Sequence, residues 1–157
     1  ELTGLDRVRH ALELLQIDAA IVSPGVPMPT VPLAAEAIGC APDQIIKTVV
    51  FSTTDGSAVI AIANGTSRID RQVLASVAGV AKLKLADPTF VLERTGYPAG
   101  GVSPVGIRDD AAQIVIDRRV LEQEVVYGGA GTEDDLLRLR TPDLVQVTRA
   151  RIAEIVN

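Results

Sequence analysis

The alternation of apolar and polar positions divides the chain into short helices and strands. Apolar residues at Leu5, Val8, Leu12 and Leu15 form one stripe and predict a first helix, which Thr3 can cap. Capping residues, together with proline in the first turn or glycine at the end, predict four more helices. These helices begin after Thr30, Asp70 and Asp87 and at Thr141.

Apolar runs rich in β-branched residues predict strands over residues 19–22, 45–51, 57–63, 80–85, 112–116, 125–127 and 136–140. The sequence from Thr53 to Gly56 is a strong turn signal, so the second and third strands should pair as a hairpin. Residues 147–156 fit neither period. Hairpins interspersed with helices, without a linker or repeat between them, predict one α+β domain over residues 1–157 with a mixed sheet.

The composition excludes several classes of site. Only 3% of the 157 residues are aromatic, which leaves too few rings for a base-stacking platform. A single cysteine, Cys40, and a single histidine, His10, cannot form a disulfide, a cysteine-rich zinc site or the usual histidine clusters. We interpret Cys40 as a packing residue and His10 as a surface residue, and we expect neither a metal nor another cofactor.

Charge and hydropathy bear on partners and location. No apolar run approaches the length of a membrane span, and the first residues do not resemble a signal peptide, so we expect a cytoplasmic protein without a membrane partner. A net charge of −5 disfavours wholesale coating of nucleic acid, and we expect no DNA partner. It still allows a local basic rim, because five cations cluster in the middle of the sequence: Arg68, Arg71, Lys82, Lys84 and Arg94.

A lysine interrupts the apolar strand over residues 45–51. Side chains alternate along a strand, so Lys47 should share a face with Ile45, Val49 and Phe51. An ammonium among large apolar groups is costly unless it is paired, reaches water or binds an anion, which makes Lys47 a site candidate. The alternative is a strand-edge lysine whose stem lies on apolar surface while its head reaches water.

The most unusual segment is the glycine–proline loop over residues 97–106. The adjacent glycines, Gly100 and Gly101, would let a ligand approach the main chain, while Pro98 and Pro104 limit how far the loop can flex. Exposed N–H groups on such a stiff loop could bind a carbonyl oxygen as it becomes an oxyanion. The alternative is a plain connection between a helix and a strand.

A second glycine segment covers residues 128–132. It lacks the lysine of a phosphate-binding loop and the strand–helix context of a dinucleotide fingerprint, so we expect a mobile turn there. The adjacent acids at residues 109–110 and 134–135 lie on loop-like segments, and we expect them to be solvated.

Three sequence blocks together resemble the YbaK/EbsC family, the free-standing relatives of the editing insertion in bacterial prolyl-tRNA synthetase. The blocks are Pro42–Thr48, Ala86–Pro88, and Thr95–Tyr97 followed by Gly100–Gly106. Their order and spacing agree with the family, and the resemblance extends from the first helix to Thr148. It implies a mixed, strongly curved, partly barrel-like sheet packed with helices.

The resemblance also implies an activity, the hydrolysis of the ester that links a wrong amino acid to tRNA. Editing exists because the aminoacylation site of a synthetase rejects a smaller amino acid only weakly by binding alone. In this family the strand lysine lies near the backbone of the tRNA 3′ end, a role that falls on Lys47. The family's glycine–proline loop, which places backbone N–H groups against the aminoacyl carbonyl, corresponds here to the loop that contains Gly100, Gly101 and Pro104. The family uses no side-chain general base, and a hydroxyl of the terminal ribose assists the attacking water.

The remaining expectations concern the substrate and its partners. We expect the substrate to contact a wider set of residues, namely Thr30, Tyr97, Ser103, Pro104, Asp117, Gly128 and Gly129. The implied partners are misacylated tRNA and prolyl-tRNA synthetase. The family's cysteine-specific members carry a polar aromatic residue where this chain has Ser23–Gly25 and a serine near Tyr127–Gly129, so cysteine and alanine are both open as the amino acid on tRNA(Pro).

Two other classes of function compete with a deacylase. One is a catalytically silent module that binds tRNA or a synthetase. The other is a Schiff-base enzyme that uses Lys47 as a nucleophile with a lowered pKa.

Overall fold

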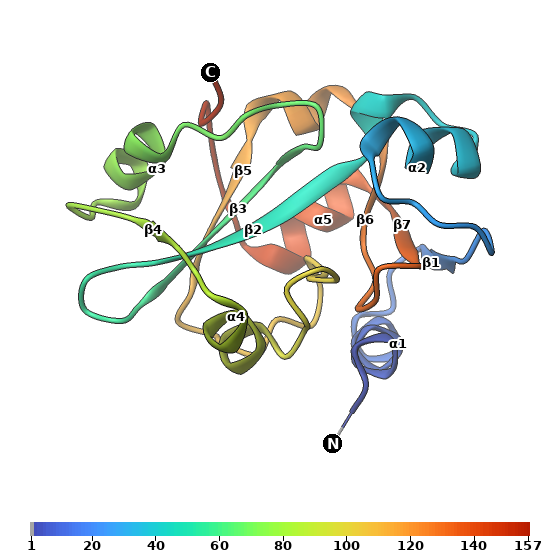
Figure 1. The fold of residues 1–157 in the computed structure, drawn as a ribbon, viewed down its shortest axis with the longest axis horizontal. Helices are drawn as coiled ribbons and strands as arrows, with labels where there is room; N and C mark the ends of the chain where they lie inside the picture. The colour runs from blue at the N-terminus through green and yellow to red at the C-terminus, as the bar shows by residue number, and fades with distance from the viewer. Residues whose placement is uncertain (1) are drawn as a thin grey trace.

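The computed structural model describes residues 2–157. Its elements follow the chain (Figure 1) as α1 (Gly4–Leu15), β1 (Ala19–Val22), α2 (Val31–Ile38), η1 (Pro42–Gln44), β2 (Ile46–Ser52), β3 (Ala58–Asn64), α3 (Arg71–Ala78), β4 (Lys84–Leu85), α4 (Pro88–Thr95), β5 (Gln113–Asp117), η2 (Arg118–Glu122), β6 (Val125–Gly129), β7 (Leu136–Arg140), α5 (Thr141–Thr148) and β8 (Arg151–Ala153). The short elements η1 and η2 are 3₁₀ helices. The predicted α+β class is confirmed.

The strands form two sheets rather than one. The larger sheet has the order β4-β2-β3-β5-β8 and is mixed, because β2 is antiparallel to β3 and β4 whereas β3, β5 and β8 run parallel. The smaller sheet is antiparallel and has the order β1-β7-β6. A parallel bridge between Ile45 and Tyr127 joins the start of β2 to β6. The strong, barrel-like curvature stays a prediction.

Apolar side chains cover both faces of the larger sheet. The main core lies between the two sheets, where Ile60, Ile62 and Ile116 meet Leu137 and Leu139. A second cluster lies on the opposite face of the larger sheet, under α3, and a small third cluster lies under α2. Because both faces are covered, a ligand has to approach at the strand ends and the loops.

Local sequence signals position most helices correctly. Thr3, Thr30, Asp70 and Asp87 each accept a hydrogen bond from a backbone N–H in the first turn of the helix that follows. The last helix starts at Thr141, with a proline in its first turn. These five helix starts agree with the predicted ones.

Two strand predictions have wrong bounds. The predicted strand over residues 80–85 is reduced to Lys84 and Leu85, because residues 80–83 leave the ladder and Leu83 turns into the second cluster. Conversely, β6 continues through Gly128 and Gly129, which pair with β7, so the expected mobile turn is wrong for these two glycines. The ambiguous C-terminal segment contains the short strand β8, parallel to β5.

The start of β2 also differs from the prediction. Ile45 lies outside the strand, at a bridge to Tyr127, and packs in the third cluster, near α2. Val49 and Phe51 do alternate with the main-core residues of β2 and pack in the second cluster. Lys47 is therefore the first residue of its face, at the end of the strand, where a side chain can reach water.

Candidate functional site

A cavity of about 290 Å³ opens where the start of β2 meets the glycine–proline loop and the end of β6. It gathers five of the residues predicted for the site, namely Thr30, Lys47, Gly100, Gly101 and Gly129. The remaining wall comes from the chain before α2 and from the segment between β6 and β7. Segments that are far apart in the sequence thus form one small concave site, the form expected for a small-molecule pocket.

Lys47 is a half-buried cation without an acidic partner. Its Nζ donates a hydrogen bond to the backbone carbonyl of Ser67, just after β3. The two ion pairs found among residues 2–157 join Arg9 to Asp6 and Arg94 to Asp109, so neither involves Lys47. Burial lowers the pKa of the Lys47 ammonium. An anion bound in the cavity would therefore give the Lys47 ammonium the ion-pair partner that it lacks among the described residues.

Gly101 is held by main-chain contacts on both sides. Its N–H donates to the Pro98 carbonyl at 2.9 Å, and its carbonyl accepts from the Gly131 N–H at 2.9 Å. A Cβ at this position would lie 2.7 Å from the Gly131 carbonyl carbon and from the Thr132 nitrogen. Gly101 therefore fixes the loop against the segment after β6, and its own N–H is already used.

The donors left for a ligand are neighbouring amides of the same loop. Within residues 2–157 no hydrogen bond uses the N–H of Gly100 or of Val102, and both residues line the cavity. Stiffly held N–H groups of this kind can stabilise an oxyanion. The oxyanion role of the loop stays a prediction; of the two glycines named for it, Gly101 already uses its N–H within the loop, whereas the N–H of Gly100 is free among the described residues.

Gly131 extends this stack of backbones to the first helix. A Cβ on Gly4, at the start of α1, would lie 2.1 Å from the Gly131 carbonyl oxygen. The Gly131 N–H in turn donates to Gly101. The start of α1, the Gly131 turn and the glycine–proline loop are therefore packed backbone against backbone.

The side of the cavity formed by residues 132–135 is acidic. The Asp135 carboxylate accepts hydrogen bonds from the hydroxyls of Ser23 and Thr132. These two hydrogen bonds lower the pKa of Asp135. The expectation that these acids are solvated is therefore wrong for Asp135, which is hydrogen-bonded. It is also wrong for Asp109, which forms an ion pair with Arg94.

Thr48 was missed by sequence reasoning. It lines the cavity beside Lys47, and its Oγ1 is buried without a hydrogen-bond partner within the described residues. A buried hydroxyl without a partner is unusual. Thr48 ends the Pro42–Thr48 block of the family resemblance, but a threonine in a strand is ordinary and suggested no role of its own.

Five predicted contact residues lie outside the wall of this cavity. Tyr97 and Ser103 are fully buried beneath the loop, where the Tyr97 hydroxyl donates to the Val105 carbonyl at 2.6 Å and the Ser103 hydroxyl accepts from the Val105 N–H at 3.3 Å. Burial raises the pKa of Tyr97 to about 12. Asp117 is buried as well and accepts from the N–H groups of Arg119 and Ile155.

The other two contact residues, Pro104 and Gly128, also lie outside the cavity wall. Pro104 lines a larger opening, of about 790 Å³, between β5 and the end of α5. That opening contains none of the other predicted site residues. A Cβ on Gly128 would touch Pro104 at 3.3 Å, so the two residues are neighbours.

The interpretations of His10 as a surface residue and Cys40 as a packing residue agree with the structure. His10 is exposed, and Cys40 packs, half-buried, in the third cluster, where burial raises the pKa of its thiol. Within residues 2–157 no group of three His, Cys, Asp or Glu side chains is arranged to hold a metal. None of the helices in this part of the chain has the length and apolarity that a bilayer crossing requires.

Sequence comparison relates the chain to proteins of tRNA editing. A family model for the aminoacyl-tRNA editing domain matches residues 26–147. A proline–tRNA ligase of Desulforamulus reducens is 34% identical over 131 residues, covering 83% of this chain and 21% of the ligase. EbsC of Enterococcus faecalis, a candidate Cys-tRNA(Pro)/Cys-tRNA(Cys) deacylase, is 25% identical over 123 residues, covering 78% of this chain and 74% of EbsC. The chain thus spans about a fifth of the ligase and about three quarters of EbsC.

Structural comparison agrees with the sequence relatives. A solved structure described as a candidate trans-editing enzyme for prolyl tRNA synthetase superposes with a TM-score of 0.90 at 30% identity, covering 100% of this chain and 99% of that one. The hypothetical protein APE2540 gives a TM-score of 0.86 at 30% identity over 96% of this chain and 99% of its own. The predicted resemblance to YbaK/EbsC is confirmed, and the chain belongs to the aminoacyl-tRNA editing domain family.

Proposed function

We propose that this chain is a single editing domain that hydrolyses the ester between a small, wrongly attached amino acid and tRNA(Pro). The observation that carries the proposal is the cavity that places Lys47 beside the amides of the glycine–proline loop. An aminoacyl-tRNA end offers a phosphate for the first and an ester carbonyl for the second. Cysteine and alanine are the proposed amino acids, and the relatives' names favour tRNA(Pro).

Each group has a distinct role in the proposed reaction. Lys47 binds a phosphate near the 3′ end and positions the ester. Water, assisted by a hydroxyl of the terminal ribose, attacks the carbonyl carbon, and the N–H groups of Gly100 and Val102 bind the oxyanion. The C–O bond to the ribose then breaks, the ribose oxygen takes a proton, and the free amino acid leaves.

The test is a deacylation panel in which tRNA(Pro) carries alanine, cysteine, serine or proline. We expect rapid hydrolysis of one or more of the three wrong esters and much slower hydrolysis of Pro-tRNA(Pro). Adding prolyl-tRNA synthetase to the same reactions tests the proposed partner. Tight binding of every misacylated tRNA without turnover would replace the deacylase with a silent binding module.

We also propose that hydrolysis needs no metal. EDTA should leave the rate unchanged when the tRNA is refolded and held at constant magnesium until the assay begins. A loss of activity that one particular metal restores at micromolar concentration contradicts this proposal.

A Schiff-base enzyme is the second candidate, because burial lowers the pKa of Lys47 and so favours a neutral amine. Borohydride should trap no adduct between Lys47 and carbonyl compounds if the editing proposal is correct. A stable adduct on Lys47, located by mass spectrometry, would favour this candidate instead.

A further inference from the structure

Charge is distributed very unevenly along the chain. Residues 44–86 carry five Lys or Arg and two Asp, whereas the rest of the chain carries ten Lys or Arg and 18 Asp or Glu. The net charge of the first part is therefore +3 and that of the remainder is −8, with histidine neutral. A protein with an overall charge of −5 thus keeps one basic part.

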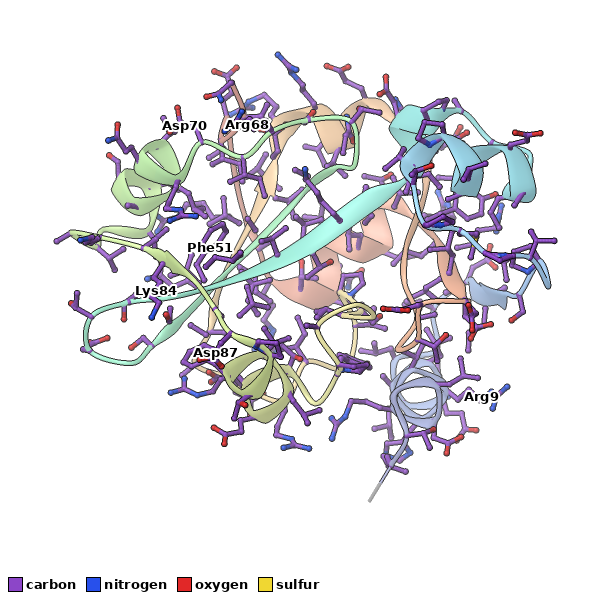
Figure 2. All side chains as sticks on the ribbon, in the orientation of Figure 1. Arg9, Phe51, Arg68, Asp70, Lys84 and Asp87 are labelled. Carbon is purple, nitrogen blue, oxygen red and sulfur yellow. The ribbon has the colours of Figure 1, made fainter. Side chains whose placement is uncertain are left out.

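The fold gathers this basic part on one side of the molecule. Residues 44–86 form β2, β3, α3 and β4, and Figure 1 shows α3 and β4 together at one end of the larger sheet. Figure 2 labels Arg68, Phe51 and Lys84 on this side, together with Asp70 and Asp87, which cap α3 and α4. We call the four cations beyond the cavity the α3–β4 face, which consists of Arg68, Arg71, Lys82 and Lys84.

Strand β2 and the segment after β3 connect the cavity to this face. Lys47 donates to the carbonyl of Ser67, and Arg68 is the next residue. The guanidinium of Arg71 lies 5.7 Å from the centre of the Phe51 ring. Phe51 belongs to β2, the same strand as Lys47. Lys84 pairs with Ser52 at the far end of that strand. From Lys47 to Ser52 the strand extends roughly 17 Å, at about 3.3 Å per residue.

The cations of this face are free to bind an anion. None of the four takes part in an ion pair among residues 2–157. The two acids of the basic part are occupied elsewhere, since Asp70 caps α3 through the N–H groups of Gln72 and Val73 and Asp55 is bonded within the β2–β3 turn. Arg71, Lys82 and Lys84 are also exposed.

We propose that the α3–β4 face binds the phosphate backbone of the tRNA acceptor stem while Lys47 meets its 3′ end. The inference rests on the proposed function and extends it from the terminal nucleotide to the duplex behind it. Double-stranded RNA is recognised mainly through its shape and its backbone, for which unpaired cations spread over one face are suited. The acidic remainder of the surface repels the same backbone and so orients it.

The test measures binding of uncharged tRNA(Pro), which requires no catalysis. In Lys82→Gln/Lys84→Gln we expect the Kd at 0.1 M salt to rise about tenfold and the slope of log Kd against log salt to flatten by roughly 1 to 2. The matched control is Arg118→Gln/Arg119→Gln, which removes the same charge from two exposed residues of η2. The control should stay within about twofold of the wild type.

A second measurement separates the stem from the 3′ end. The Lys82/Lys84 variant should raise KM for misacylated tRNA about tenfold at unchanged kcat, and should hydrolyse a misacylated CCA trinucleotide like the wild type. Equal effects of both double variants, or no change in the first, would overturn the inference and leave Lys84 as a residue that merely protects a sheet edge. A wild type that binds tRNA in this way yet hydrolyses nothing in the panel would refute the deacylase and retain the face.

Discussion

The strand side and the loop side of the cavity hold their shape by different means. On the strand side, Lys47 and Thr48 are held by the ladder between β2 and β3, in which every residue of β2 has a partner. On the loop side, Gly101 is held by the absence of a side chain, because its Cα packs directly on Gly131 and Thr132. Gly129 is similar, since a Cβ there would lie 2.1 Å from the Val102 carbonyl oxygen.

Substitutions on the two sides of the cavity should therefore have different consequences. A ladder held by backbone hydrogen bonds tolerates a change of side chain, so substitution of Lys47 should alter the charge of the site and little else. A loop that depends on contact between backbones cannot accept a Cβ without moving. Mutations on the strand side should therefore affect the rate alone, whereas mutations on the loop side should affect both the rate and the stability.

The largest expected effect comes from the strand side. Lys47→Ala should lower kcat/KM for deacylation on the order of 10² to 10³-fold, because one positioned charge next to the reacting ester is lost. The melting temperature should change little, since the variant loses one hydrogen bond but also a partly desolvated charge. Lys47→Arg should rescue poorly, because a planar fork does not replace a compact ammonium. Full activity in a well-folded Lys47→Ala protein would refute the role of this residue.

The next largest effect is expected on the loop side. Gly101→Ala should lower the deacylation rate on the order of 10²-fold, and more than it lowers tRNA binding, because the displaced loop no longer aligns its amides with the oxyanion. It should also lower the melting temperature by several degrees, since the new Cβ meets the backbone of residues 131–132.

Gly56→Ala is the matched control for this variant. Gly56 lies in the β2–β3 turn with φ of 84° and has open space around the position of a Cβ, so alanine there costs backbone strain without touching the cavity. It should lower the melting temperature and keep the wild-type rate. If Gly101→Ala behaved in the same way, the loop would be only a connection.

A smaller effect is expected beneath the loop. Tyr97→Phe removes the donor to the buried Val105 carbonyl and should lower the free energy of unfolding by about 1 to 3 kcal/mol in a urea titration. Ser103→Ala should cost about 1 kcal/mol and reduce the rate only a few-fold, since its hydroxyl holds the loop. Abolished turnover in Ser103→Ala, with an acyl-enzyme on Ser103 in the wild type, would instead establish a covalent mechanism.

The smallest effect is a pH dependence at the acidic side of the cavity. Because the pKa of Asp135 is held below its ordinary value of 3.8, folding favours the ionised form. The stabilisation is complete above that value and is lost as the pH falls through the folded-state pKa. Asp135→Asn should therefore be less stable than the wild type at pH 7, by about 1 kcal/mol or less, and the difference should shrink towards pH 3. A difference that grows on acidification would contradict this assignment.

Features that depend on near neighbours could be predicted from the sequence. Thr30 caps α2 through Leu33, three residues away, and a spacing of this kind is visible without a fold. Lys47 also stood out, because an ammonium in an apolar strand violates a local pattern. The resemblance to a family supplied the chemistry that such patterns cannot name.

Features that depend on distant contacts could not be predicted. Ser23 and Asp135 are 112 positions apart, and only the pairing of β1 with β7 brings their loops together. Gly128 and Gly129 suggested a turn because glycine is a poor strand former, yet pairing with β7 keeps them in β6. The same holds for Gly101, whose carbonyl accepts a hydrogen bond from the N–H of Gly131, 30 positions along the chain.

The backbone stack of Gly4, Gly131 and Gly101 makes the first helix a mechanical support of the site. The start of α1 is connected to the loop through two backbone contacts, Gly4 with Gly131 and Gly131 with Gly101. Neither contact includes a side chain that could move to accommodate a displacement. Closely packed groups transmit strain rather than absorb it. A displacement of the start of α1 would therefore reach the loop through the backbones of Gly131 and Gly101 alone.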